Sequence, residues 1–413
     1  MVKLVPFLVF FGLFLFNKRR VGHFFTLSNY ILLLYSFSTL SFFFYSLFNT
    51  SIYWNFQSLL LIVVPTFLLI LPLSRVEIQM RRSGFCFSEL NKKRFTVLSW
   101  GLIVLSIYSI FFFSRGLLRV FSVDIVALRQ GYGSLYEGGT IWSKAACLGA
   151  YLSPVAMFLF YYNLIKKQLP RYITMLLLLS SCSFVVYTLN VAGRDGIVIW
   201  VLNFVGLFFL FYHAANRKDR RFICRILMWS LVLVLPLFLF ISSARFSQSS
   251  GGVSRTVISY AGQSLGNLSQ NVDAYERSGY GATGANGLFE LYYKAVNMLL
   301  GESRGGRYNR FDNADEYFRY MDSMGFSTFA FSYYVGSLYP IHTSIWGLAA
   351  FVGVLFAVFS FYLKEKGAEL QTKYLICAFS WYTILISGLF YFYYGTYIGN
   401  FFLLITLLIP LLL

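Results

Sequence analysis

Long apolar stretches separated by short polar connections restrict this chain to a membrane-embedded helical fold. A helix needs about 20 mostly apolar residues to cross the hydrocarbon core of a bilayer. Eleven stretches satisfy or approach this requirement: 4–16, 26–48, 52–73, 96–113, 141–165, 172–191, 196–213, 226–243, 342–363, 374–391 and 396–413. Only 12% of the 413 residues are charged, against about a quarter in soluble proteins. We therefore expect an all-α, polytopic helical bundle of about eleven transmembrane helices, with the lipid bilayer as its surroundings.

The basic residues are concentrated in every second connection between these stretches. Twenty of the 34 Lys and Arg residues lie in five connections: 17–25, 74–95, 166–171, 214–225 and 364–373. The positive-inside rule places such connections in the cytoplasm, which puts the N-terminus outside and the C-terminus inside. The net charge of +18 therefore serves orientation, and we expect no nucleic-acid partner.

One external connection is far longer than the others and divides the chain into three regions. Residues 1–243 carry the first eight predicted transmembrane helices, 244–341 form the long connection, and 342–413 carry the last three helices. The long connection holds eight basic and eight acidic residues, so it is neutral. Its apolar segment 288–300 is too short to cross the membrane, and its apolar segment 327–341 runs directly into the next predicted span. Both segments therefore predict interfacial or re-entrant helices. Such a connection is the default place to look for function.

The sequence gives little indication of a metal or cofactor site. All five cysteines fall in predicted spans or cytoplasmic connections, without a metal-type pair, so we expect neither a disulfide framework nor a bound metal. Asp312, Asp315 and Glu316 could hold a divalent cation, but their spacing favours ion pairs with Arg310 and Arg319.

Two glycine-containing motifs have weak support. Residues 262–266 match the G-x-S-x-G pattern of serine hydrolases, which requires a strand before the serine and a helix after it, and this context predicts neither. Residues 279–284 match G-x-G-x-x-G, but no strand–helix–strand pattern surrounds them. We interpret both as structural segments.

External arginines are the strongest functional indication from the residues alone. Arg194, with Asp195, occupies a turn of about four residues between two apolar spans, where a charge is costly unless it faces a cavity or a partner. Arg245 follows the eighth span directly. Further arginines on the same predicted side are Arg115, Arg119 and Arg255. Arginine binds phosphate oxygens bidentately, so converging arginines would suit an anionic lipid head group, above all a diphosphate. The alternative for each arginine is that it has no functional role and simply extends its charged group to the membrane interface. For Arg245 the two interpretations are equally favoured.

His342 lies at the external mouth of the ninth predicted span. A lone histidine is more often a structural hydrogen-bonding group than a functional one. Its position beside the long connection nevertheless keeps it as a candidate general base or phosphate partner.

Several local segments resemble the bacterial O-antigen and oligosaccharide repeat-unit polymerases of the Wzy type. Ala-Gly-Arg-Asp-Gly at 192–196 resembles the family's Gly-Arg turn, and Ser-Ala-Arg-Phe at 243–246 opens the long connection. Tyr-Ala-Gly-Gln-Ser at 260–264 is similar to a Tyr-x-Gly segment, and 327–336 resembles an aromatic-x-Gly segment before a late span. The likeness extends to the architecture of many short spans and one dominant periplasmic loop.

This resemblance implies a GT-C-like fold and a metal-independent, inverting glycosyl transfer without a cofactor. The implied substrate is a glycan on undecaprenyl diphosphate, transferred to another lipid-linked repeat unit on the periplasmic side of the inner membrane. The implied partners are a chain-length regulator and a flippase of the same pathway.

Together, the charge pattern and the resemblance predict the site residues. The predicted catalytic residues are Arg194 and Arg245 for the diphosphate, with His342 as first and Glu316 as second candidate base. The predicted substrate-binding residues are Arg115, Arg119, Asp195, Arg255, Tyr260, Arg310 and Tyr334.

Two other functions compete with the polymerase. The related O-antigen ligases, which transfer the glycan to a different acceptor, also use arginine and a late histidine. A transporter or flippase for lipid-linked oligosaccharide would instead predict internal repeats and charges within the spans, neither of which we find.

Overall fold

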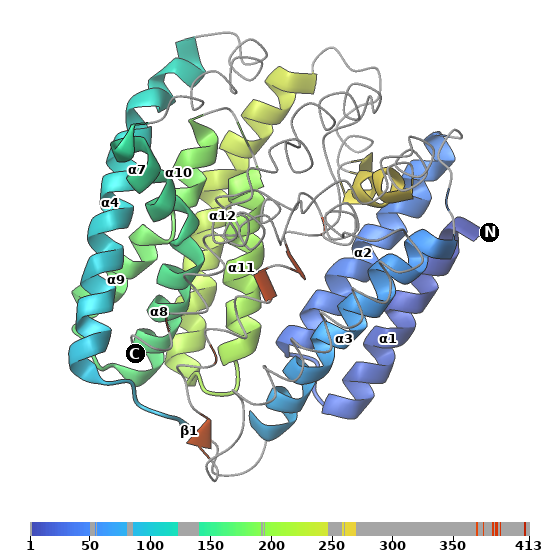
Figure 1. Cartoon of the computed structure of the whole chain (residues 1–413), viewed down its shortest axis with the longest axis horizontal. Helices are drawn as coiled ribbons and strands as arrows, with labels where there is room; N and C mark the ends of the chain where they lie inside the picture. Colours follow the sequence, from blue (N-terminus) through green and yellow to red (C-terminus); the bar gives the residue numbers. More distant parts are fainter. Residues whose placement is uncertain are drawn as a thin grey trace, which may run out of the picture. The chain divides into compact units, whose positions relative to one another are not determined.

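The computed structural model describes most of the first 246 residues and a few later segments. The described residues are 2–49, 54, 56–80, 86–122, 140–190, 193, 195–246, 258–259, 261–269, 369–370, 375, 382–383, 385–386, 389 and 409. Within them the elements are helices, apart from two strands of two residues each (Figure 1). The predicted all-α class is therefore confirmed. The chain divides into two compact units, which we describe separately.

Unit 1 contains the N-terminal helices and a short later helical segment. Its elements are the 3-10 helix η1 (Val2–Leu4), α1 (Val5–Val21), α2 (Leu27–Phe48), α3 (Phe56–Met80) and the helical residues 258–259 and 261–269. Gly22, in the left-handed conformation with φ 71°, ends α1, and its N–H donates to Lys18 O. Thr26 caps α2 by accepting a hydrogen bond from the Asn29 N–H. These two signals produce the sharp reversal between α1 and α2.

A buried polar network joins one end of α1, α2 and α3. Asn17 Nδ2 donates to Ser28 Oγ and to Asn29 Oδ1, both at 2.8 Å, while Ser74 Oγ donates to Asn17 Oδ1 at 2.6 Å. The Glu77 carboxylate accepts from Ser28 N at 2.9 Å and also from Ser28 Oγ. The network therefore brings the predicted basic connections 17–25 and 74–95 to the same end of unit 1.

Unit 2 contains most of the remaining described helices. Its elements are β1 (Cys86–Phe87), α4 (Lys92–Ser122), α7 (Ile141–Tyr151), α8 (Ser153–Lys166), α9 (Arg171–Ser180), α10 (Ser183–Leu189), α11 (Asp195–Phe211), α12 (Arg217–Phe246) and β2 (Glu369–Leu370). The two strands pair in parallel, with Cys86 opposite Glu369. Aromatic side chains fill the contact between α8 and α11: Tyr161 stacks on Phe211 with ring centroids 5.8 Å apart, and its hydroxyl donates to Phe204 O.

The helices coincide with the first eight predicted spans, but several extend further than the apolar stretches. Four helical segments are long and apolar enough to cross a membrane, namely Leu27–Phe48, Ser58–Arg75, Lys92–Leu117 and Arg171–Leu189, the last of which comprises α9 and α10. A fifth is obtained if α7 and α8, bent by 43° at their junction, form one span. The chain thus has helices suited to a membrane, whereas the last three predicted spans fall largely outside the described residues.

Several predicted connections are partly wrong because helices continue into them, and three cases illustrate this. Residues 217–225 belong to α12, and 114–122, expected in an external loop, are the last turns of α4. Residues 244–246, expected to open the long connection, are the end of α12. Polar residues can continue a helix beyond its apolar part, since backbone hydrogen bonding does not require apolar side chains.

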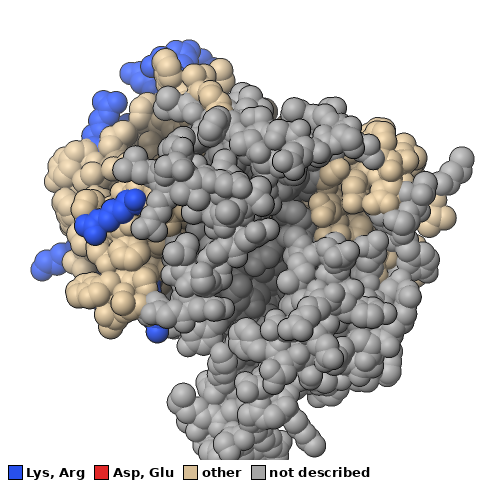
Figure 2. Space-filling view, turned by 90° about the horizontal axis from the view of Figure 1, so that it is seen from above, with Lys and Arg blue, Asp and Glu red and all other residues tan. Residues whose placement is uncertain are grey.

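Within unit 2, the basic connections gather at one end. The backbone N–H of Leu90 donates to the Tyr162 hydroxyl at 2.9 Å, which places the start of α4 beside the end of α8. The Arg171 guanidinium lies 5.9 Å from the centroid of the Phe222 ring, which joins the start of α9 to that of α12. Figure 2 is seen from above Figure 1 and so does not look onto this end; on the described surface in that view it shows Lys and Arg, and no Asp or Glu.

Candidate functional site

The turn that carries the predicted catalytic Arg194 lies between α10 and α11, where the two helices are in near contact. The Gly193 N–H donates to Thr188 O at 2.8 Å. A Cβ at Gly193 would lie 2.7 Å from Asp195 Oδ1, and one at Gly196 would overlap Thr188 Oγ1. Glycine is therefore required at both positions by close approach, and the turn is tight.

The end of α4 packs against the same turn. A Cβ at Gly116 would overlap Asn190 Oδ1, so the Asn190 side chain rests directly on the α4 backbone. Arg115, the preceding residue, is exposed and its guanidinium lies 4.6 Å from the centroid of the Phe111 ring. The structure thereby brings Arg115 and the residues flanking Arg194 to one end of unit 2, opposite the basic connections.

Asp195 has a structural role at this end. It is exposed and is the first residue of α11, so its negative charge lies at the positive end of the helix dipole. Its carboxylate folds back over Gly193. The sequence predicted Asp195 as a substrate-binding residue. Its position shows in addition that its carboxylate stabilises the turn and the start of α11.

The predicted site residues divide into three groups. Arg115 and Asp195 are described with their side chains, whereas Arg119 and Arg245 lie on the described backbones of α4 and α12. Arg115 and Arg119 are helical instead of lying in a loop, and Arg245 belongs to α12 instead of the long connection. The other predicted residues lie outside the described part of the chain: Arg194, Arg255, Tyr260, Arg310, Glu316, Tyr334 and His342.

The segment that resembles the Tyr-x-Gly motif is in part a helix packed tightly on α2 in unit 1. Ser38 Oγ donates to Ala261 O at 2.7 Å, and a Cβ at Gly262 would overlap the backbone N of Phe42. Ser264 is fully buried within this helix. The serine thus lies inside a helix instead of between a strand and a helix, which confirms that the G-x-S-x-G match is no nucleophile elbow.

Sequence reasoning missed Asn190, the side chain that links α4 to the turn. An asparagine at the end of an apolar span was a usable signal, because a polar side chain there needs a partner. Its glycine partner, Gly116, could not be identified without the three-dimensional contact.

The described part of this end offers hydrogen-bonding and cationic groups, but no metal site. No group of three or more His, Cys, Asp or Glu side chains is close enough to hold a metal ion among the residues described. Arg115 is exposed at this end and is a group that could bind an anion. No family model, no curated protein and no solved structure matches this chain.

Proposed function

We propose that the chain is an inner-membrane glycosyltransferase that polymerises undecaprenyl-diphosphate-linked repeat units into O-antigen or a similar surface polysaccharide. The observation that carries this proposal is the packing of the α4 end, with Arg115, against the Gly193–Asp195 turn. Arg115 and the described neighbours of Arg194 thus lie at one end of unit 2, and several arginines at such an end would suit recognition of a lipid diphosphate.

The proposed reaction moves a growing glycan from its lipid carrier to a second lipid-linked unit. The acceptor sugar hydroxyl attacks the anomeric carbon, a new glycosidic bond forms, and the bond to the diphosphate breaks with its electron pair leaving on the diphosphate. His342, or Glu316 in its place, accepts the hydroxyl proton. Arg194 and Arg245 stabilise the charge that develops on the diphosphate, without proton transfer or a metal.

The remaining predicted residues bind the two substrates. Arg115, Arg119, Arg255 and Arg310 contact phosphate or sugar oxygens, Asp195 accepts a hydrogen bond from a sugar hydroxyl, and Tyr260 and Tyr334 pack against the glycan. The GT-C-like arrangement, eleven spans, periplasmic N-terminus and cytoplasmic C-terminus are parts of this proposal, together with a flippase and a chain-length regulator as partners.

Substitution of Arg194 tests the proposal in cells. Arg194→Ala should abolish long polymer while the protein stays inserted, because loss of one fixed charge-stabilising donor lowers turnover by about 10²–10³. Arg194→Lys keeps the charge but loses the bidentate geometry, so it should restore only short chains. The readout is the ladder of polysaccharide chain lengths on a gel.

Lys218→Ala is the matched control, because it removes one basic charge from the first turn of α12, which follows the end of α11 that is remote from Arg194. It should leave the ladder unchanged. A normal ladder in Arg194→Ala would overturn the assignment. In a deletion strain, single lipid-linked units on the periplasmic face support a polymerase. Retention of those units in the cytoplasmic leaflet would indicate a flippase, and polymer left on its lipid a ligase.

A further inference from the structure

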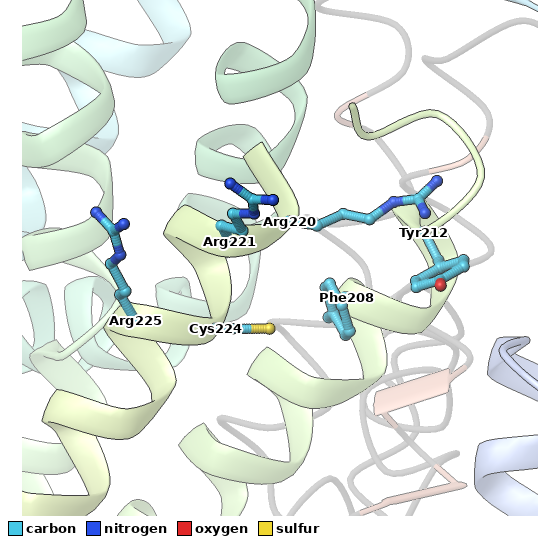
Figure 3. Close-up of a pocket in the computed structure, with 6 residues that line it drawn as sticks. All are labelled: Phe208, Tyr212, Arg220, Arg221, Cys224 and Arg225. Carbon is cyan, nitrogen blue, oxygen red and sulfur yellow. The ribbon is translucent and has the colours of Figure 1, made fainter. Parts of the chain in front are cut away.

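A cationic cavity lies at the other end of α11 from the Gly193–Asp195 turn, roughly 20 Å away by helix rise. It has a volume of about 450 Å³ and is lined by Phe208, Tyr212, Arg220, Arg221, Cys224 and Arg225 (Figure 3). The first two residues come from the end of α11 and the residues directly after it, and the others from the first turns of α12. None of the six lining residues is acidic, so the cavity carries the charge of three guanidinium groups.

One arginine is held in a fixed orientation at the wall of the cavity. The Arg220 guanidinium lies 4.1 Å from the centroid of the Tyr212 ring, and its Nε donates to Ala215 O at 2.9 Å. Phe208 packs edge-on against Tyr212, with ring centroids 5.6 Å apart. Stacking and the Nε hydrogen bond fix the plane of the guanidinium, so its two amino groups are the ones left to bind a ligand.

The other two arginines lie one helical turn apart and complete the cationic wall. Arg221 and Arg225 are exposed, four residues apart on α12, and in Figure 3 both extend toward the N-terminal end of that helix. Asp219, the acidic residue of this segment, is 7% exposed and is not part of the lining. The guanidinium groups therefore do not meet a carboxylate within the cavity.

The position of this charge on its helix also favours an anion. Arg220 lies in the first turn of α12, at the positive end of the helix dipole, where positive charge is destabilising and an anion is stabilising. An anion in the cavity would offset both the dipole and the mutual repulsion of the arginines. Orientation of the chain in a membrane requires basic residues in this connection, but it requires neither a cavity nor a stacked arginine.

From these observations we propose that the cavity binds a phosphate group through Arg220, Arg221 and Arg225. Arginine can bind phosphate oxygens bidentately, and Tyr212 and Phe208 supply an apolar wall beside the arginines that suits the substituent of a phosphate ester. The phosphate belongs either to an anionic phospholipid head group or to a soluble phosphate, and the two sources share the same recognition chemistry. The cavity does not involve any residue of the proposed glycosyl-transfer site.

Cys224 offers a direct measure of occupancy, because it lines the cavity and is exposed. Alkylation of this thiol by N-ethylmaleimide, an uncharged reagent, can be followed by peptide mass spectrometry on the purified full chain in detergent. The lipid arm compares dioleoylphosphatidylglycerol with dioleoylphosphatidylcholine at equal mole fraction. The soluble arm compares sodium pyrophosphate with sodium chloride at equal ionic strength.

We expect the anionic lipid or pyrophosphate to slow alkylation at least about fivefold, since the bound phosphate covers the thiol. Arg220→Gln/Arg221→Gln should raise the concentration needed for half-protection at least about tenfold, the value expected for losing one charge-assisted hydrogen bond. Arg217→Gln/Lys218→Gln removes the same charge from the same helix turn, but neither residue lines the cavity. This control should change half-protection by less than about threefold.

Protection by the lipid alone assigns a head-group site, and protection by pyrophosphate alone assigns a soluble ligand. The absence of protection in both arms of the unmodified chain overturns the proposal without any need for a variant. Equal loss in the two double variants also overturns it, because bulk surface charge would then explain the effect. Arg220→Lys, which keeps the charge without the stacked plane, serves as the milder variant if the double substitution prevents folding.

Discussion

Among single residues, Glu77 departs most clearly from the rule that carboxyl groups stay exposed to solvent. Glu77 is 4% exposed and lies two residues beyond the candidate span that ends at Arg75. Burial raises the pKa of Glu77 to about 7, although hydrogen bonds from Ser28 lower it and so oppose the effect. The folded chain therefore holds a proton on Glu77 more tightly than the unfolded chain does.

This shift predicts a pH dependence of stability. Between about pH 4.5 and pH 7 the folded state binds more protons than the unfolded state, so stability is greatest at the acid end and falls as pH rises through about 7. A shift of this size corresponds to a loss of about 3 kcal/mol over the interval. Thermal unfolding of the purified chain in detergent, at pH values from 5 to 8, measures it.

Glu77→Gln is the diagnostic variant for that prediction. Glutamine resembles the protonated acid, so the variant should lose this part of the pH dependence and be the more stable protein at pH 8. Glu89→Gln is the control, because Glu89 is exposed and lies in the same predicted connection, 74–95. This variant should keep the pH dependence of the parent. Parallel pH profiles for the parent chain and Glu77→Gln would contradict the assignment to this carboxyl.

Among the elements, the lengths of the apolar stretches predicted where helices occur, but they did not predict where a predicted span is interrupted and divides into two helices. Predicted span 141–165 is two helices because Pro154, at the first turn of α8, lacks the N–H that would continue the ladder from α7. Predicted span 172–191 is divided at Ser181, whose Oγ donates to Leu178 O and accepts from Trp200 Nε1. The proline was visible in the sequence, whereas the serine contact depends on a helix that follows later in the chain.

Close helix packing at glycine yields a prediction at this scale. Gly262→Ala places a methyl group where the backbone of α2 already lies, at Phe42, so it should destabilise unit 1 by about 1–3 kcal/mol. Gly12→Ala, in α1, is the matched control, since a Cβ there meets nothing within 4 Å. Unfolding midpoints in detergent should fall for the first variant and hold or rise for the second. A midpoint for Gly262→Ala at or above the parent value would contradict the observed packing.

At the scale of the whole molecule, the sequence pattern predicted the helical class and the grouping of connections, but not the residues that join them. The charge pattern alone predicted that basic connections lie together. Within unit 2 the Leu90–Tyr162 hydrogen bond, and within unit 1 the Asn17–Ser74 hydrogen bond, show such connections at the same end of the unit. Arg115 lies at the end of unit 2 away from the basic connections, and its position after an apolar stretch predicted this separation. Its proximity to the Gly193–Asp195 turn was not predictable, because it depends on Asn190 fitting over Gly116.

The proposed function requires this chain itself to form the glycosidic bond, and reconstitution in liposomes measures that bond formation. The purified chain in liposomes is given undecaprenyl-diphosphate-linked repeat units extracted from a strain lacking it, with a chelator present and no other protein. We predict lipid-linked oligomers of two or more units, released undecaprenyl diphosphate in equal amount to the new bonds, and loss of both products with Arg194→Ala. Recovery of only single units with the parent chain, under conditions where the protein is folded and inserted, would show that the chain is not the polymerase.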